Sequence, residues 1–260
     1  MSNDGIVRFE PKGPGGELHQ WDEIPASDLE SGRPVQRGHF YLDDAERGLS
    51  AGVWDCTAFT GKPGPYSVNE FMVILEGSVT IVEAGGRETT IRAGESFIIP
   101  KGLHCQWKQP GYVRKYFVIF NDASGLKPSN PAALHVLRPD PKGVLTKSTP
   151  PAPELIQSGS PVQHAHEWFS DLTGQWTVGV WDTTGYHRKP IPFPRHELMH
   201  ILEGKVTLTD AGGKAQTFTA GDTFFVPLGT VCDWKSEGYL RKIYCIFQPR
   251  LTAAKTEAAE

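Results

Sequence analysis

The chain repeats itself after a shift of 127 residues, without a gap. Gly52-Val53-Trp54-Asp55 aligns with Gly179-Val180-Trp181-Asp182, and Ile74-Leu75-Glu76-Gly77 aligns with Ile201-Leu202-Glu203-Gly204. A repeat of this length indicates one folding unit used twice, and 260 residues are enough for two such domains. We expect domain 1 at residues 1–127 with an N-terminal arm, domain 2 at 128–250 with a proline-rich lead arm, and a mobile tail at 251–260.

Short strands separated by glycine turns are the expected content of each unit. The chain has 28 glycines and 21 prolines, and no segment keeps a 3.6-residue apolar period. Phe71–Leu75 and Ser78–Val82 flank a turn at Gly77, and Ala84-Gly85-Gly86 is typical of a hairpin loop. The pattern predicts an all-β fold made of sandwiches or barrels.

Charge and composition exclude several kinds of partner. The net charge of −4 gives no electrostatic reason to expect nucleic acid. We expect no membrane partner, since no apolar run approaches the roughly 18–20 residues that span a bilayer. Residues 1–20 lack the features of a secretory signal, and four cysteines in so long a chain do not indicate a disulfide framework. A cytoplasmic location is therefore expected.

The spacing of glutamate, glycine and proline resembles the two sequence motifs of the cupin superfamily. Glu70 precedes Gly77, and Glu197 precedes Gly204, with the six-residue spacing of the first motif. The second motif is matched by Gly94, Pro100, Gly102 and Cys105, and again by Gly221, Pro227, Gly229 and Cys232. The resemblance covers residues 31–123 and 158–250. The residue pattern is most similar to that of bicupins grouped with (S)-ureidoglycine aminohydrolase and the ethanolamine-utilisation cupin. It implies two tandem double-stranded β-helix (jelly-roll, RmlC-like) barrels.

The metal ligands that the resemblance would imply are mostly replaced. Metal-binding cupins use two histidines and the glutamate of the first motif together with the histidine of the second. Those histidine positions are occupied by Gly64, Tyr66 and Cys105 in one unit and by Ile191, Phe193 and Cys232 in the other. Because a divalent first-row metal needs three or four N, O or S donors, we predict no metal and no other cofactor.

Strand alternation places a second set of residues in each barrel interior. We expect Glu70 and Glu197 as the candidate catalytic residues. The candidate ligand-binding residues are Tyr66, Met72, Cys105 and Trp107 in unit one, and Phe193, Met199, Cys232 and Trp234 in unit two. Gly64 and Tyr66 predict a roomier and more polar mouth for unit one.

The roles of these residues stay open at this point. A buried glutamate suits acid–base work if its pKa is raised, but it could instead be paired with a lysine or arginine. The cysteines could be nucleophiles or fill the space of the lost histidine, and the aromatic rings could stack on a ligand or close the cavity. Arg114-Lys115 and Arg241-Lys242 could lie at a solvated strand edge or balance the glutamates. His196 and His200 alternate with Glu197, so strand parity places them on the other face.

Three functions fit these observations. The first is binding of a small polar metabolite in the barrel, with a metal-independent hydrolase or isomerase reaction that uses a buried glutamate. The second is a metabolite-binding or accessory cupin without catalysis, and the third is a metal-dependent aminohydrolase. The resemblance links all three to nitrogen (ureido or amine) metabolism. A homodimer is left open.

Overall fold

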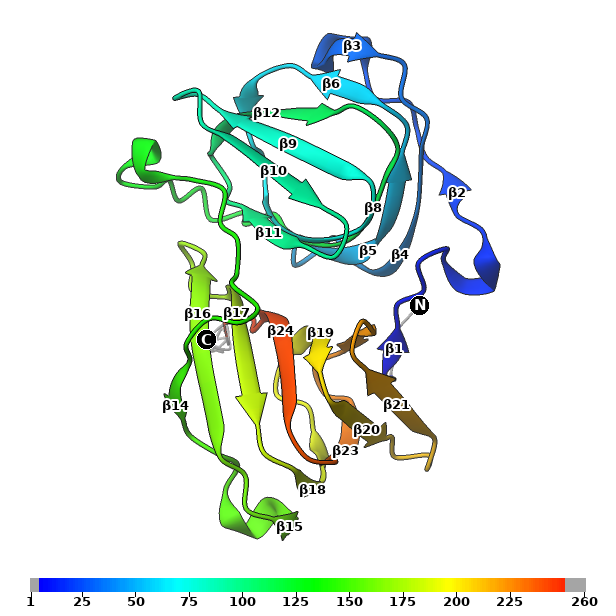
Figure 1. The fold of residues 1–260 in the computed structure, drawn as a ribbon, viewed down its shortest axis with the longest axis vertical. Coiled ribbons are helices and arrows are strands. Elements are labelled where there is room, and N and C mark those ends of the chain that lie inside the picture. The colour runs from blue at the N-terminus through cyan, green and yellow to red at the C-terminus, as the bar shows by residue number, and fades with distance from the viewer. Residues whose placement is uncertain (1–4, 251–260) are drawn as a thin grey trace, which may run out of the picture.

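Two β-barrels lie one above the other, each made of two antiparallel sheets (Figure 1). The computed structural model describes residues 5–250, so the predicted mobile tail at 251–260 lies outside the described residues. Besides strands, this part of the chain contains four short 3-10 helices, η1 (Pro14–Gly16), η2 (Ala26–Asp28), η3 (Pro131–Ala133) and η4 (Pro153–Leu155). Within residues 5–250 no helix is long and apolar enough to cross a membrane.

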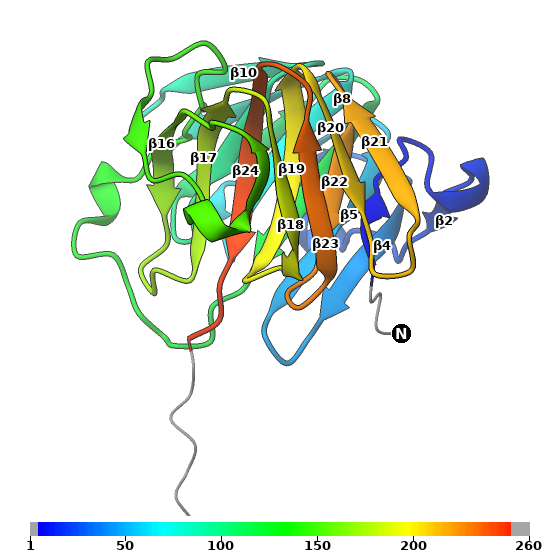
Figure 2. The same ribbon diagram turned by 90° about the horizontal axis from the view of Figure 1, so that it is seen from below.

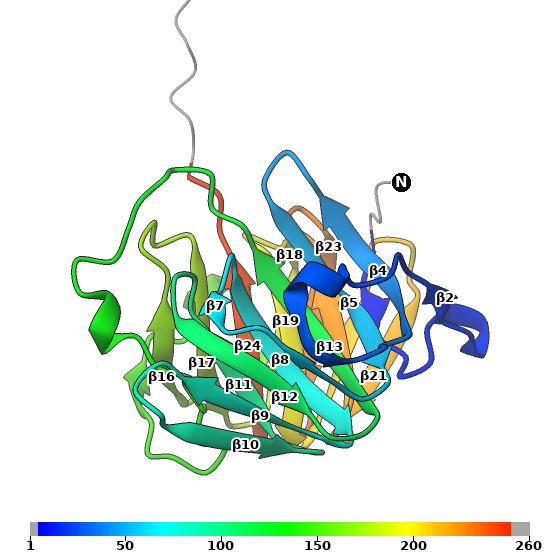
Figure 3. The same cartoon turned by 90° about the horizontal axis from the view of Figure 1, so that it is seen from above.

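In barrel one, an inner sheet faces the other barrel and an outer sheet closes the far side, as seen from above in Figure 3. The inner sheet has the order β11 (Ser96–Ile99), β8 (Asn69–Glu76), β13 (Val113–Phe120), β5 (Leu49–Cys56), β4 (Gln36–Asp44) and β2 (His19–Gln20). The outer sheet has the order β10 (Glu88–Arg92), β9 (Ser78–Glu83), β12 (His104–Gln109), β6 (Phe59–Gly61) and β3 (Leu29–Gly32), with β7 (Gly64–Pro65) paired to β12.

Barrel two repeats this plan, and Figure 2 shows it from below. Its inner sheet has the order β1 (Val7–Arg8), β22 (Thr223–Val226), β19 (His196–Glu203), β24 (Leu240–Phe247), β17 (Trp176–Thr183), β16 (Gln163–Ser170) and β14 (Thr146–Ser148). Its outer sheet has the order β15 (Ile156–Gly159), β18 (Tyr186–Pro192), β23 (Val231–Ser236), β20 (Lys205–Thr209) and β21 (Ala215–Thr219). Strands β8, β11, β12 and β13 recur as β19, β22, β23 and β24 at the 127-residue shift. The predicted all-β tandem fold is confirmed.

The apolar core of the protein is divided into three clusters. One fills the interior of barrel one and one the interior of barrel two, and the third lies between the inner sheets. Along β13, Val113 and Phe117 face the barrel interior, whereas Tyr116 and Phe120 face the other barrel, where the ring of Phe120 lies 5.0 Å from that of Phe247. Because both faces of the central strands β8, β13, β19 and β24 are buried, their sequences are mostly apolar.

The segments that precede the two barrels exchange places. β1 comes before barrel one in the sequence but pairs with β22 of barrel two. The linker before barrel two pairs with barrel one, since Leu137 bridges to Ile98 in β11. Each lead arm therefore extends the inner sheet of the other barrel. The division of the sequence at residues 127 and 250 stays a prediction.

The turn between β8 and β9 has no room for a side chain. Gly77 has a φ of 79°, and a Cβ atom there would lie 1.9 Å from the carbonyl oxygen of Tyr112. Gly204 occupies the same place in barrel two, with a φ of 85° and the carbonyl of Tyr239 at 2.1 Å. This close approach explains why glycine recurs at this turn in both units.

We predict that Gly77→Ala lowers the free energy of unfolding by about 2 kcal/mol or more, since it adds both a clash and a left-handed backbone penalty. Gly85→Ala in the β9–β10 turn is the matched control, because nothing lies within 4 Å of a Cβ atom there. That variant should stay within about 0.5 kcal/mol of the parent. Urea denaturation of both variants measures the difference, and equal stabilities would contradict the steric argument.

Candidate functional site

A buried glutamate lies at the same position in each barrel, on the strand next to the centre of the inner sheet. Glu70 in β8 stands opposite Ile99 of β11 and Ile119 of β13. Glu197 in β19 stands opposite Val226 and Ile246. Both side chains are almost fully inaccessible to solvent. An ionised carboxylate in such surroundings needs a partner charge.

In barrel one a lysine supplies that charge. Lys115 Nζ donates to Glu70 Oε1 at 2.7 Å and lies 3.1 Å from the sulfur of Met72. The ammonium also stands 4.9 Å from the ring centres of both Trp54 and Trp107, within the range of cation–π attraction. Lys115 therefore balances Glu70, one of the two roles left open by the sequence, whereas Arg114 contacts Asp55 and Glu76.

Barrel two repeats the lysine cage and adds an arginine. Lys242 Nζ donates to Glu197 Oε1 at 2.7 Å, lies 3.1 Å from Met199 Sδ, and stands 4.8 and 5.0 Å from the rings of Trp181 and Trp234. Arg195 Nε donates to the other oxygen, Glu197 Oε2, at 3.1 Å. Burial alone would raise the pKa of the Glu197 carboxyl, but Lys242 and Arg195 hold that pKa below its ordinary value.

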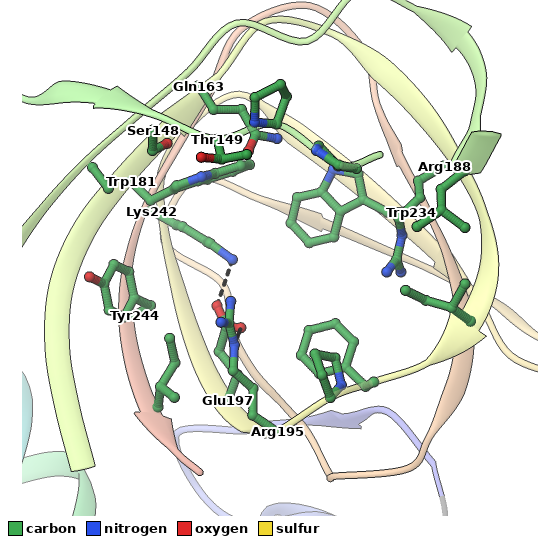
Figure 4. A pocket seen from close by; sticks show the side chains of 18 of the residues that line it. Ser148, Thr149, Gln163, Trp181, Arg188, Arg195, Glu197, Trp234, Lys242 and Tyr244 are labelled. Atoms are coloured by element: carbon green, nitrogen blue, oxygen red, sulfur yellow. Dashed lines mark hydrogen bonds and ion pairs between the residues drawn. The ribbon is translucent and has the colours of Figure 1, made fainter. Parts of the chain in front are cut away.

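A cavity of about 470 Å³ opens onto this charged group in barrel two (Figure 4). Such a volume lies within the usual range of small-molecule sites, about 300–1,000 Å³. Aromatic side chains form much of the wall, with polar groups from Gln163, Arg188 and Tyr244. The segment from Ser148 to Leu155, which contains Pro150 and Pro151, also contributes to it. The cavity thus has mostly apolar walls and a small number of convergent charges.

Inside barrel one the cavity beside Tyr66 and Cys105 has a volume of only about 150 Å³, so the prediction that unit one is the roomier is wrong for the barrel interior. The reason lies in the lead arm. Trp21 stacks on Phe40 at 4.7 Å and packs edge-on against Phe117, close to Gly38. At the 127-residue shift, Trp21 corresponds to Ser148, and Gly38 and Phe117 correspond to Ala165 and Tyr244, which all line the larger cavity. An indole therefore fills in barrel one the space that a serine leaves open in barrel two.

Arg188 and Arg195 are functional candidates that sequence reasoning missed. Arg188 in β18 is buried and donates through Nη2 to the Cys232 carbonyl at 3.2 Å, and its Nε has no partner in the described part of the chain. Figure 4 shows its guanidinium facing the cavity, across from Lys242 and Glu197. The corresponding residues in barrel one are Gly61 and Val68, so a comparison of the two units away from the motifs would have revealed both arginines.

The structure brings some of the predicted site residues to a cavity wall and not others. Glu197, Phe193 and Trp234 line the cavity of barrel two, while Met199 lies against Lys242 and Cys232 lies in the apolar core. In barrel one the small cavity is lined by Tyr66, Cys105 and Trp107, while Glu70 and Met72 contact Lys115. Tyr66 donates its hydroxyl hydrogen to Glu70, a role that Arg195 fills in barrel two. Trp54 and Trp181, not singled out from the sequence, complete the two cages.

Both cysteines of the second motif are protonated at neutral pH. Burial, reinforced by Glu83, raises the pKa of the Cys105 thiol to about 11, and burial raises that of Cys232. A thiol is nucleophilic only as the thiolate, which an apolar environment disfavours. The alternative of a small residue in the place of the lost histidine is therefore the better account of both.

The side chains present do not fit the metal site of a metal-binding cupin. Both glutamates are engaged by ammonium or guanidinium groups, and across residues 5–250 no three His, Cys, Asp or Glu side chains gather as a ligand set. His196 accepts from the Leu228 amide, and His200 bonds to Thr223, with burial lowering the pKa of His200 to about 4. A lysine ammonium supplies the positive charge beside the motif glutamate.

Comparison with known proteins gives one matching family and many solved structures with a similar fold. The EutQ-like cupin domain matches residues 44–117 and again residues 171–244. A solved structure of a protein of unknown function of the DUF861 family from Pseudomonas syringae pv. tomato is 30% identical, with a TM-score of 0.76, and the match covers 93% of this chain and 99% of that one. No curated protein matches the chain.

Two more distant structures share only the fold. YlbA from E. coli, of the DUF861 family, has a TM-score of 0.55 at 10% identity over 97% of this chain and 95% of its own. A cupin 2 conserved barrel domain protein from Leptotrichia buccalis has a TM-score of 0.54 at 11% identity, over 88% and 98%. Similarity at this level bears on the barrel architecture and not on a ligand.

We predict that Lys115→Met lowers the free energy of unfolding by about 3–5 kcal/mol, because it leaves Glu70 as an unpaired buried charge. The double variant Lys115→Met/Glu70→Gln removes the charge as well and should recover most of that loss. Chemical denaturation of the two variants and the parent measures the coupling. A double variant no more stable than Lys115→Met would contradict the charge argument.

The buried thiols should react slowly. At pH 7 we expect iodoacetamide to label neither Cys105 nor Cys232 in the folded protein, and labelling to become fast on addition of denaturant. Mass spectrometry of the intact and digested protein reports the modified positions. Rapid labelling of either residue at neutral pH would show a thiolate and revive the nucleophile interpretation.

Proposed function

This chain belongs to the EutQ-like cupin family, and we propose that its second barrel binds a small organic anion. Arg188 carries the proposal. It is a buried guanidinium on the wall of a cavity of about 470 Å³, and its Nε has no hydrogen-bond partner among residues 5–250. A buried donor without a partner costs about 1–3 kcal/mol, and more when it is charged. An anion in the cavity would offset the cost of burying this guanidinium, which Figure 4 shows facing the cavity.

The charges around the cavity support the same conclusion. Arg188, Arg195 and Lys242 contribute three positive charges to the wall, and Glu197 is the single carboxylate among its lining residues. Guanidinium groups bind carboxylates through paired N–H donors, which adds geometric selectivity to the charge attraction. Barrel one has the same lysine–glutamate pair but lacks both arginines and most of the space, so the proposal concerns barrel two alone.

Binding without acid–base catalysis is the alternative that the geometry favours. A general acid needs a raised pKa, but the pKa of Glu197 is held down and both of its oxygens accept hydrogen bonds. A metal-independent hydrolase or isomerase that relies on this glutamate therefore has less support, and the metal-dependent aminohydrolase lacks a fitting donor set. Ureido and amino acids carry a carboxylate, so the expected link to nitrogen metabolism remains compatible with the proposal.

Location and assembly stay predictions. The four cysteines, Cys56, Cys105, Cys232 and Cys245, are all free and buried, which fits a reducing cytoplasmic environment. A homodimer stays open.

We expect small carboxylates to bind and their neutral amides not to bind. Calorimetric titration at low ionic strength should give an affinity that falls at least about tenfold in Arg188→Gln, because the variant removes the charge-assisted contact. Arg87→Gln is the matched control, since it removes the same charge from an exposed turn of barrel one. Amides that bind as tightly as the acids, or an unchanged affinity in Arg188→Gln, would contradict the proposal.

A second variant tests the location without touching any charge. Ser148→Trp combined with Ala165→Gly transfers the indole and its glycine neighbour from barrel one to barrel two. The exchange should close the cavity and abolish carboxylate binding, while the protein still folds because the same pair is accommodated in barrel one. Undiminished binding in this folded variant would place the anion site elsewhere.

A further inference from the structure

The positive charge of the large cavity is divided between two opposite walls. Arg188 lies on one side, and none of the acidic residues that the structure describes forms an ion pair with it. On the other side Lys242 and Arg195 flank Glu197, which neutralises one of these two cations and leaves one positive charge over. Figure 4 shows the open space of the cavity between the two groups. One uncompensated positive charge therefore remains on each wall.

We propose that the ligand is a small dicarboxylate that spans the cavity, with one carboxylate at Arg188 and the other at Arg195 and Lys242. The inference rests on the proposed anion site and specifies its chemical class. A monocarboxylate would satisfy only one wall and leave the other cation uncompensated. Two anionic groups on one molecule match the two charges in number and in position.

The surroundings of the two walls favour separated charges over a compact dianion. Trp234 and Phe193 contribute apolar surface to the cavity, against which a carbon chain between the two carboxylates can pack. Phosphate or sulfate carries its charges on one centre, so it can contact one wall at a time. Carboxylates at the two ends of a chain can contact both, and the best chain length reports the separation of the walls.

The test is a calorimetric series at low ionic strength with succinate, its homologues malonate, glutarate and adipate, the monoacid butanoate, and inorganic phosphate. We expect one dicarboxylate to bind at least about tenfold more tightly than butanoate, because it makes a second charge-assisted contact. Phosphate should bind no more tightly than butanoate. In Arg188→Gln and in Arg195→Gln the advantage of the dicarboxylate over butanoate should shrink to about twofold or less, while Arg87→Gln keeps it.

The outcomes separate this inference from the proposed function. If mono- and dicarboxylates bind with equal affinity and both weaken in Arg188→Gln, the dicarboxylate inference is overturned and the anion site stands. Phosphate binding more tightly than every dicarboxylate likewise overturns the two-walled arrangement alone. If no member of the series binds, the anion site itself fails. A dicarboxylate advantage that disappears in both arginine variants supports the inference.

Discussion

A lysine ammonium held between a carboxylate and two indole rings is the interaction on which the interior of each barrel depends. The pair joins neighbouring strands of the inner sheet, β8 with β13 and β19 with β24, and lies where solvent hardly reaches. Taking both charges out of water is expensive, so the gain comes from their short contact and from the faces of the rings. The cage thereby fixes an ammonium group beside the glutamate of the first motif.

The same lysine cage has different surroundings in the two barrels. In barrel one Tyr66 completes the hydrogen bonding of Glu70, and Trp21 fills the adjoining space, which leaves an interior closed by side chains. In barrel two the corresponding positions are Phe193 and Ser148, and Arg195 takes over the second contact to the glutamate. One barrel is thus stabilised as a packed body, and the other keeps its charges beside an open cavity.

The sequence predicts those features of the fold that depend on residues close together in the chain. Glycine turns and the 127-residue repeat place the strands and the inward glutamates, because strand parity is a local property. The pairing of Lys115 with Glu70 depends on strand register across the sheet, which parity alone leaves open. The size of the cavities depends on Trp21 and Ser148, which reach the barrels from arms outside the motifs. Arg188 and Arg195 correspond to Gly61 and Val68 at the 127-residue shift, so a comparison of the motifs alone does not reveal the two arginines.

The exchange of the lead arms links the filled barrel to the open one. The linker is held on barrel one where the Val136 amide donates to Glu83 at 2.9 Å and Leu137 pairs with Ile98. A few residues further along the linker, the carbonyls of Pro141 and Gly143 accept hydrogen bonds from Arg241 of β24. These bonds hold the linker on barrel two. The segment that follows forms one wall of the large cavity. Barrel one therefore holds the start of the segment that encloses the large cavity of barrel two, although its own interior is closed.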